Sequence, residues 1–204
     1  MQTINFQLIA VIIMITFYGC YFAKMITQKK QGVQTDQMGK GKTGFVKFVE
    51  ITTKIAAILV VIAELVSIFT GTNQLSETFI FHFFTLVQIT GALISFIGTI
   101  VFITAVLTMR DSWRAGVPQT DKTELITNGI YRLSRNPAFL GFDLLYIGIL
   151  LMFFNWILCI LTVFAIVMYH LQIVNVEEHF LRTAFGNEYV QYRERVCRYL
   201  GKKR

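Results

Sequence analysis

Five long apolar runs, separated by short charged segments, constrain the fold of this 204-residue chain more than any other feature. The runs cover about Ile4–Met25, Ile55–Thr70, Phe79–Met109, Ala138–Phe154 and Trp156–Val174. A helix needs about 20 mostly apolar residues to cross the hydrocarbon core of a bilayer, and about 17 can still suffice. The pattern therefore predicts an all-α integral membrane protein with about five transmembrane helices.

The composition excludes an ordinary soluble domain. Hydrophobic residues make up 54% of the chain and charged residues only 15%, whereas soluble domains carry about 25% charged residues. The three cysteines, Cys20, Cys159 and Cys197, have no spacing typical of a disulfide framework or a zinc site, so we expect no metal. The basic residues are spread over loops that flank the apolar runs, which argues against a nucleic-acid partner.

The loops alternate in charge along the chain. The segments Lys24–Glu50, Arg110–Asn136 and His170–Arg204 are each net positive, whereas Gly71–Thr78 carries only Glu77. By the positive-inside rule this pattern places the N-terminus outside and the C-terminus in the cytoplasm. No basic residue precedes the first run, so we expect a membrane helix there rather than a cleaved signal peptide. The basic loops could also attract anionic lipids or an anionic substrate.

Two local patterns predict how the helices pack. The last two runs are joined by Asn155-Trp156, and Trp156 suits an anchor at the membrane interface, which indicates a helical hairpin. In the third run, Gly91, Ser95 and Gly98 recur at helical spacing. Small residues in such a pattern favour close contact between two membrane helices.

Ionisable residues inside the apolar runs are candidates for function because they are costly in a membrane. Glu64 lies in the middle of the second run and Asp143 lies one turn inside the fourth. Glu64 could contact a substrate or a proton, or it could be protonated or hydrogen-bonded to a neighbouring helix, for example at Gln88. Asp143 follows Gly141 by two residues, and its place on a pocket wall stays open.

The segment before the fourth run has the features of a shaped helix start. Asn128-Gly129 is a turn signal. Pro137 suits the first turn of a helix, and the preceding Asn136 is biased to an extended conformation and can cap the helix with its side chain. Arg135 could be a basic membrane anchor. Alternatively, Arg135 and the amides of the helix start could receive an anionic group.

A cytoplasmic tail with an amphipathic stripe follows the fifth run. Glu177 and Glu178 should point to different faces of a helix, one of them to solvent and the other to a pocket. We expect a break at Gly186-Asn187 and an outward-facing Arg198. The tail predicts a helix on the membrane surface, with its apolar stripe at Leu181, Phe185, Tyr189, Tyr192 and Val196.

Residues 120–199 together resemble the isoprenylcysteine carboxyl methyltransferase family and its relatives, the phospholipid and phosphatidylethanolamine N-methyltransferases. The family pattern reads Gly-x-Tyr, Arg-His-Pro-x-Tyr-x-Gly, an apolar hairpin, and Glu-Glu-x-x-Leu-x-x-x-Phe-Gly-x-x-Tyr-x-x-Tyr. The second half is complete here, from Glu177 to Tyr192. In the first half, Asn136 replaces the usual histidine and Phe139 the usual tyrosine. Asn136 can still donate and accept hydrogen bonds, whereas Phe139 lacks the hydroxyl.

The resemblance implies an S-adenosylmethionine site between the cytoplasmic ends of the last two spans and the tail. Carried over by position, the residues around the cofactor are Leu125, Ile126, Tyr131, Asn136, Pro137, Ala138, Phe139, Gly141, Glu177 and Glu178.

The same resemblance leaves few candidates for the reaction centre. Eukaryotic members place an arginine before the acidic pair to hold the substrate carboxylate, and the stretch Tyr169–Gln172 has none. His170 is the nearest polar replacement, and we expect Arg135 and Asp143 beside it. Transfer of an activated methyl group needs positioning and exclusion of water more than covalent catalysis. A carboxylate acceptor needs no general base, whereas an amine must first lose a proton, for which Glu64, Asp143, His170 and Glu178 are candidates.

We therefore predict a membrane methyltransferase with a lipophilic small molecule or lipid as acceptor and with membrane lipids as surroundings. Carboxyl O-methylation of an isoprenylcysteine-like acid competes with N-methylation of a phospholipid headgroup. A small transporter or a helical scaffold is the alternative from another class. Residues 1–119 should form a three-span region and residues 120–204 the cofactor-binding core. The sequence indicates no oligomeric state.

Overall fold

The computed structural model describes residues 5–74, 81–117 and 124–202, and every long element in them is a helix. Six α-helices follow one another: α1 (Phe6–Lys30), α2 (Gly44–Thr70), α3 (Phe81–Met109), α4 (Pro137–Met152), α5 (Trp156–Gln172) and α6 (Glu178–Arg195). Two short 3-10 turns, η1 (Arg110–Ser112) and η2 (Gly129–Arg132), and one π-helical turn, η3 (Ile173–Glu177), complete the described elements. The predicted all-α fold is confirmed.

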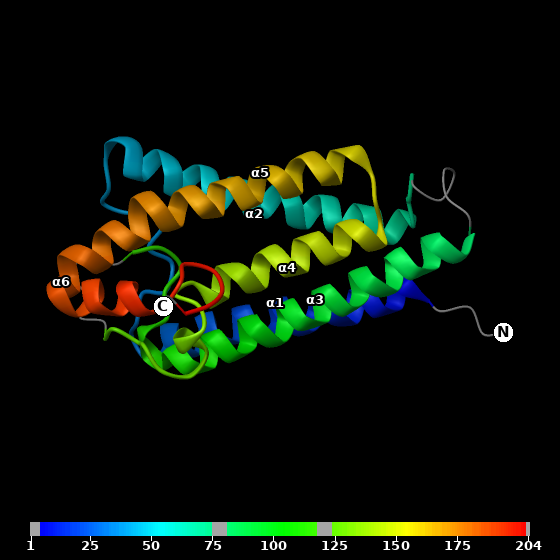
Figure 1. Ribbon diagram of the computed structural model, residues 1–204. Coiled ribbons are helices and arrows are strands. Elements are labelled where there is room, and N and C mark those ends of the chain that lie inside the picture. Colours follow the sequence, from blue (N-terminus) through cyan, green and yellow to red (C-terminus); the bar gives the residue numbers. More distant parts are fainter. Residues whose placement is uncertain (1–4, 75–80, 118–123, 203–204) are drawn as a thin grey trace.

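Helices α1 to α5 form an elongated bundle along one axis (Figure 1). α3 packs along α4 and α1, whereas α2 packs along α5, and α1 and α2 touch little. The start of α1 and the segment that follows α6 lie at opposite ends of the bundle (Figure 1). This placement fits the odd number of spans expected from the sequence, while the side on which each terminus lies stays a prediction.

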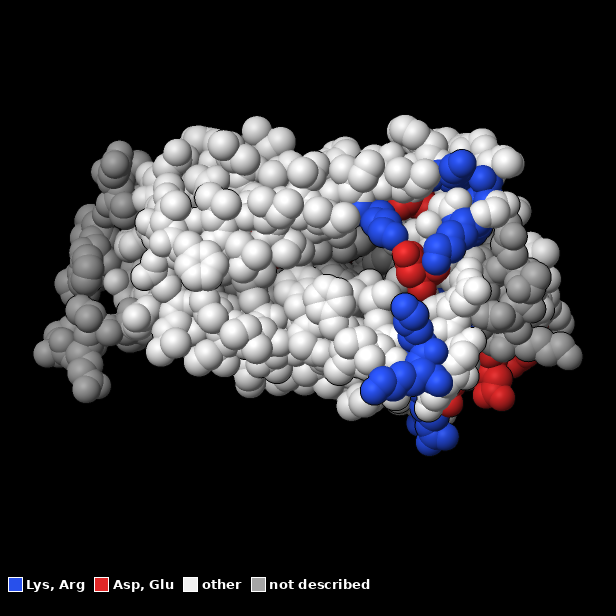
Figure 2. All heavy atoms as spheres, turned by 180° about the vertical axis from the view of Figure 1, so that it is seen from behind, with Lys and Arg blue, Asp and Glu red and all other residues white. Residues whose placement is uncertain are grey.

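Length and composition identify a multi-pass membrane protein. α1, α2, α3 and the continuous helix from Trp156 to Arg195 are each long and apolar enough to cross a bilayer. α4 has 16 residues, about 24 Å of helix, so it is shorter than the roughly 30 Å hydrocarbon core. Large apolar side chains such as Phe69 and Ile157 lie on the outside, 73% and 70% exposed. The charged side chains gather at one end of an otherwise uncharged face (Figure 2).

The second helix corrects the sequence prediction. α2 begins at Gly44 rather than near Ile55. Its first turns contain apolar residues together with Glu50, whose charge is neutralised by an ion pair within the protein. Glu50, expected in the loop, is fully buried and forms an ion pair with Lys42. Its carboxylate also accepts a hydrogen bond from the Gly39 N–H at 2.7 Å. At the predicted third span, residues 79 and 80 lie outside the described residues.

Local sequence signals explain several helix ends. The Asn155 side chain accepts a hydrogen bond from the Leu158 N–H at 2.9 Å and caps the start of α5. Gly71 ends α2 in the left-handed conformation, with φ of 63°. Gly186 has φ of 51° inside α6 and kinks it, so the break predicted at this glycine is confirmed.

The contact between α3 and α4 is so close that only small residues fit. A Cβ atom at Gly148 would lie 2.1 Å from the Ser95 Oγ, and one at Gly98 would lie 2.8 Å from the Gly141 carbonyl oxygen. Gly91 meets Gly148 in the same way, at 2.6 Å. The close packing predicted for the small residues of the third span is confirmed.

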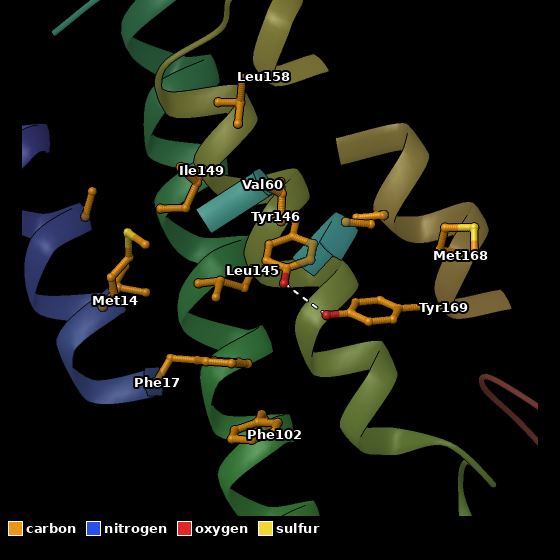
Figure 3. Close-up of a cluster of buried hydrophobic side chains, with 14 of the residues drawn as sticks. Met14, Phe17, Val60, Phe102, Leu145, Tyr146, Ile149, Leu158, Met168 and Tyr169 are labelled. Carbon is orange, nitrogen blue, oxygen red and sulfur yellow. Dashed lines mark hydrogen bonds between the residues drawn. The ribbon is translucent and has the colours of Figure 1, made fainter. Parts of the chain in front are cut away.

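Aromatic and aliphatic side chains together fill the middle of the bundle (Figure 3). Phe17 of α1 stacks on Phe102 of α3 with ring centroids 4.2 Å apart. The Tyr146 and Tyr169 hydroxyls share a hydrogen bond of 3.0 Å between α4 and α5. Gln88 donates to the Met152 carbonyl at 3.0 Å, and neither oxygen of Glu64 has a hydrogen-bond partner among the described residues. The hydrogen bond suggested between Glu64 and Gln88 is therefore wrong.

Candidate active site

The start of α4 is covered by the C-terminal segment, residues 196–202. The Arg135 N–H donates to the Cys197 carbonyl at 3.1 Å, and the Asn136 Nδ2 donates to the Arg198 carbonyl at 3.1 Å. Figure 1 shows this segment, in red, beside the beginning of α4. The helix start and the tail, far apart in the sequence, therefore form one unit.

Asn136 does not act as the cap that the sequence suggested. Its side chain makes no capping hydrogen bond to α4, because the amide nitrogen is used to hold the Arg198 carbonyl of the tail. Its backbone N–H donates to the Ser134 Oγ at 3.1 Å. Pro137 occupies the first turn of α4 as predicted. Asn136 thus orders the tail rather than the helix.

A buried ion cluster holds the tail in place. The Glu178 Oε1 lies 2.9 Å from the Arg135 Nη1 and 2.8 Å from the Arg198 Nε, and the Arg198 Nη2 donates to the Glu178 Oε2 at 3.1 Å. Arg135 also donates to the Tyr189 hydroxyl at 2.7 Å and to the Val196 carbonyl at 3.1 Å. The expectation of an outward-facing Arg198 is therefore wrong, since a carboxylate between two guanidiniums binds both.

The charge balance of this cluster keeps Glu178 ionised. Burial alone would raise the pKa of its carboxyl, but the hydrogen bonds and charges of Arg198 and Arg135 together hold the pKa below its ordinary value. The Nε and Nη1 atoms of Arg135 both donate to protein groups, namely the Val196 carbonyl and the Tyr189 hydroxyl. In this arrangement Arg135 and Glu178 hold the tail against the start of α4.

Glu177 turns to a different partner from that of Glu178. Its Oε1 accepts a hydrogen bond from the Gln172 Nε2 at 3.2 Å, and it lies close enough to Glu50 and Lys42 for their charges to act on it. The predicted divergence of the two carboxylates is confirmed, but neither is a free charge in solvent. The π-helical turn η3 sets this orientation, and no sequence signal predicted it. Such turns are frequent at functional sites.

The residues before α4 pack against α6. The Tyr192 hydroxyl donates to the Tyr131 carbonyl at 2.7 Å, and Leu125 packs against Tyr189 and Tyr192. Burial raises the pKa of the Tyr131 hydroxyl, so it stays protonated. Ile126 is half-buried in the extended segment before η2.

The remaining polar groups lie where α4, α5 and the tail meet. The Phe139 ring packs edge-on against Tyr169, with centroids 5.3 Å apart. Asp143 lies close enough to Tyr169 and Tyr199 for its charge to act on both. The His170 Nδ1 shares a hydrogen bond of 2.7 Å with the Tyr199 hydroxyl, and His170 is exposed. Asp143 and His170 thus approach the same tyrosine from two helices.

Gly141 lies apart from these groups. A Cβ at this position would lie 2.7 Å from the Phe102 Cβ of α3, so Gly141 belongs to the α3–α4 contact. Ala138 and Phe139 instead line a cavity between the helices that is open on one side.

That cavity was not predicted from the sequence. It has a volume of about 740 Å³ and extends between α1, α2 and α4, with a predominantly apolar wall. Figure 2 shows a hollow beside the charged end of the molecule. The charged side chains of its lining are Asp36, Lys54 and Arg114, and the lining also includes Ala138 and Tyr169. Lys54 and Asp36 form an ion pair of 2.7 Å there.

Comparison with known proteins supports this picture. A family model described as phospholipid methyltransferase matches residues 86–188. Protein-S-isoprenylcysteine O-methyltransferase B of Arabidopsis thaliana is 29% identical over 108 residues, which are 52% of this chain and 55% of that protein. A probable protein-S-isoprenylcysteine O-methyltransferase of Oryza sativa subsp. indica is 30% identical over 112 residues, 54% of this chain and 59% of that protein.

Protein-S-isoprenylcysteine O-methyltransferase of Saccharomyces cerevisiae is 32% identical over 72 residues, which are 35% of this chain and 30% of that protein. The chain spans less than two thirds of the length of the plant relatives it matches. The matched residues 86–188 contain the start of α4, the α4–α5 hairpin and the acidic pair of the site. The family model covers half of the chain, so this protein belongs to the phospholipid methyltransferase family.

Proposed function

We propose that this protein is an integral-membrane methyltransferase that uses S-adenosylmethionine to esterify the carboxylate of a lipophilic acid. One observation carries the proposal: the apolar cavity reaches the polar site at Ala138, Phe139 and Tyr169. A lipophilic acceptor in the cavity and a water-soluble cofactor beside the tail would meet there. The names of the plant and yeast relatives agree with an isoprenylcysteine-like acid as acceptor.

The described residues suit the cofactor chemically. The Asp143 Oδ1 and the Gln172 Oε1 are buried and have no hydrogen-bond partner in the part of the chain that the structure describes. The Glu177 carboxylate lies next to Gln172. Ribose hydroxyls, an ammonium and an exocyclic amine are donors that such acceptors can bind. When bound, S-adenosylmethionine supplies a methyl group already activated on a sulfonium.

The chain itself then has to hold the acceptor and exclude water. The cavity wall binds the lipid portion, and the weak contact between α1 and α2 offers a lateral path from the bilayer. Asp36, Lys54 and Arg114 together give the charged end of the cavity a net positive charge, although Asp36 already pairs with Lys54, and this net charge favours an acceptor carboxylate. Phe139 and Tyr169 close the meeting point with aromatic surface, which orders the reacting groups and keeps water away.

The protonation chemistry favours a carboxylate over an amine. A carboxylate oxygen is ionised at neutral pH and needs no base. An amine acceptor would need a base, and Asp143 is the best candidate because its buried Oδ1 has no hydrogen-bond partner among the described residues. His170 is exposed and shares its Nδ1 with Tyr199, so we assign it a positioning role toward that tyrosine. N-methylation of a phospholipid headgroup is the second candidate, carried by the free Asp143 oxygen.

We propose a functional division along the chain as well. Residues 1–119 supply α1 and α2, which form most of the cavity wall, and residues 120–204 supply the polar site. The charged end that holds both the tail and the loop before α2 would face the cytoplasm, where the cofactor is made available.

Transfer of a labelled methyl group tests the proposal. Protein in lipid nanodiscs is given methyl-tritiated S-adenosylmethionine with either N-acetyl-S-farnesylcysteine or phosphatidyl-N-methylethanolamine. We expect label that base releases from the first acceptor, because a methyl ester hydrolyses. Base-stable label in the phospholipid alone would establish N-methylation instead, and no transfer to either lipid would overturn the proposal.

A further inference from the structure

Two exposed leucines lie close to each other at the charged end of the molecule. Leu133 is 52% exposed and Leu200 is 67% exposed. The N–H of Gly201, the residue after Leu200, donates to the Leu133 carbonyl at 2.8 Å, and this hydrogen bond brings the two leucines together. Large apolar side chains that gather on an exposed surface indicate a site of contact with a partner or a membrane.

Leu200 belongs to a tight turn that is anchored on two sides. The Cys197 N–H donates to the Gly201 carbonyl at 2.9 Å and closes the turn. One side of the turn is bound to the start of α4. On the other side, the Tyr199 hydroxyl shares its hydrogen bond of 2.7 Å with the His170 Nδ1, in the last turn of α5. The turn therefore holds Leu200 between the ends of two membrane helices.

The length of α4 sets the depth of this turn in the bilayer. The 16 residues of α4 span about 24 Å, less than the roughly 30 Å hydrocarbon core. Leu133 precedes the first residue of α4 by four positions, so it lies at the boundary between hydrocarbon and headgroups. Figure 1 shows the C-terminal segment beside the beginning of α4, with most of α6 farther toward the end of the bundle. Lipid headgroups, rather than bulk water, therefore surround the two leucines.

Basic side chains flank the leucine pair. Arg132 precedes Leu133 and Lys202 follows the turn, and both basic residues are exposed. The ion cluster adds one net positive charge, because two arginines share the single carboxylate of Glu178. These groups together carry three net positive charges. Such a surface fits an anionic phospholipid, whose headgroup pairs with the cations while its acyl chain contacts the leucines.

We propose that Leu133 and Leu200 dock into the lipid boundary at this end of the protein, and that Arg132 and Lys202 bind the headgroup of an anionic phospholipid. Leu200 and Lys202 belong to the C-terminal segment that covers the start of α4, so the bound lipid holds this segment closed. Opening of the candidate active site then depends on the lipid composition of the membrane. The proposal uses no methyl transfer and stands independently of the proposed function.

A photoreactive side chain at position 200 tests the lipid contact. p-Benzoylphenylalanine replaces Leu200 in protein in nanodiscs of equal parts phosphatidylcholine and phosphatidylglycerol, and mass spectrometry identifies the lipid adducts after illumination. We expect phosphatidylglycerol adducts to exceed phosphatidylcholine adducts about fivefold, the contribution of one cation near an anionic surface. The double substitution Arg132→Gln and Lys202→Gln should bring this ratio close to one. The control Arg182→Gln, at an exposed position of α6, should leave the ratio unchanged.

Amide hydrogen exchange tests whether the lipid holds the C-terminal segment closed. The backbone N–H groups of Arg135 and Gly201 form hydrogen bonds between this segment and the residues before α4, so their exchange reports its opening. In phosphatidylglycerol they should exchange about fivefold faster in Lys202→Gln than in the wild type. In phosphatidylcholine the two proteins should exchange alike. Comparison of two proteins within one lipid cancels the effect of surface charge on local pH.

Absence of lipid adducts at position 200 would place the leucines away from the bilayer and overturn the docking. Equal adducts of the two lipids in protein that carries Arg132 and Lys202 would overturn the anionic headgroup site. Equal exchange of the wild type and Lys202→Gln in phosphatidylglycerol would overturn the hold on the C-terminal segment. Each of these results leaves the proposed function standing, because labelled methyl transfer tests that function separately.

Discussion

Replacing Glu178 with Gln removes one negative charge from between two guanidiniums and keeps the size of the side chain. The Arg135 side chain is 5% exposed and would lose the charge that compensates it. Breaking a buried ion pair by removing one partner costs about 3–5 kcal/mol. The Gln oxygen can still accept one hydrogen bond, and the Arg198 side chain is 34% exposed, so we expect the lower end of this range. About 3 kcal/mol corresponds to a roughly 150-fold easier opening of the tail.

Amide hydrogen exchange followed by mass spectrometry measures this opening directly. The backbone N–H groups of Arg135 and Gly201 donate across the tail, to the Cys197 and Leu133 carbonyls, and should exchange faster in Glu178→Gln by the same factor of roughly 150. Exchange in the membrane helices should not change. Glu188→Gln is the control, because Glu188 is exposed on the same helix. Unchanged exchange of the tail in Glu178→Gln would refute the assigned role of the ion cluster.

The same cluster predicts a dependence on pH. The pKa of Glu178 is lowered in the folded protein from an ordinary value of 4.5, so the folded state binds fewer protons than the open one. Its stabilisation is then complete above pH of about 4.5 and is lost as the pH falls through the lower folded-state pKa. Amide hydrogen exchange of the tail, corrected for the intrinsic dependence of the exchange rate on pH, should accelerate only below pH of about 4.5. The Glu178→Gln variant should lack this acceleration.

Two further substitutions test the packing and the cavity. Gly148→Ala places a Cβ 2.1 Å from the Ser95 Oγ and should lower the free energy of unfolding by about 1–3 kcal/mol. Thermal unfolding in detergent measures this loss. The control Gly19→Ala, whose Cβ would have no atom within 4 Å, should behave as wild type. Equal stability of both variants would contradict the close α3–α4 contact. Ala57→Phe fills the cavity wall and should reduce methylation of farnesylcysteine at least tenfold without changing the affinity for S-adenosylhomocysteine. Ala23→Phe, on an exposed face of α1, should be neutral, and full activity of Ala57→Phe would exclude the cavity as the acceptor site.

Hydropathy predicted the bounds of a helix well where one local physical effect determines where that helix begins. α4 and α5 have almost the predicted bounds, because Pro137 and Asn155 act as local start signals. The start of α2 was missed by about three turns. An averaged hydropathy cannot see that Glu50 is neutralised by Lys42 within the fold, and it therefore treats this segment as a charged loop.

The sequence predicted individual candidate residues of the site but not the contacts between them. The resemblance predicted Arg135, Glu177 and Glu178 as site residues, since their spacing repeats the pattern of a family. It could not show that Arg198 completes an ion cluster with two of them, because that contact depends on how the tail folds back. The cavity is a property of helix packing, and no sequence pattern predicted it.

Calorimetric titration of S-adenosylhomocysteine into protein in lipid nanodiscs tests the central claim most directly. We expect saturable binding to the wild type, at least tenfold weaker binding to Glu177→Gln or Asp143→Asn, and unchanged binding to the exposed control Glu188→Gln. Absence of binding in folded wild-type protein, or equal affinity in all of these variants, would contradict a cofactor site between α4, α5 and the tail.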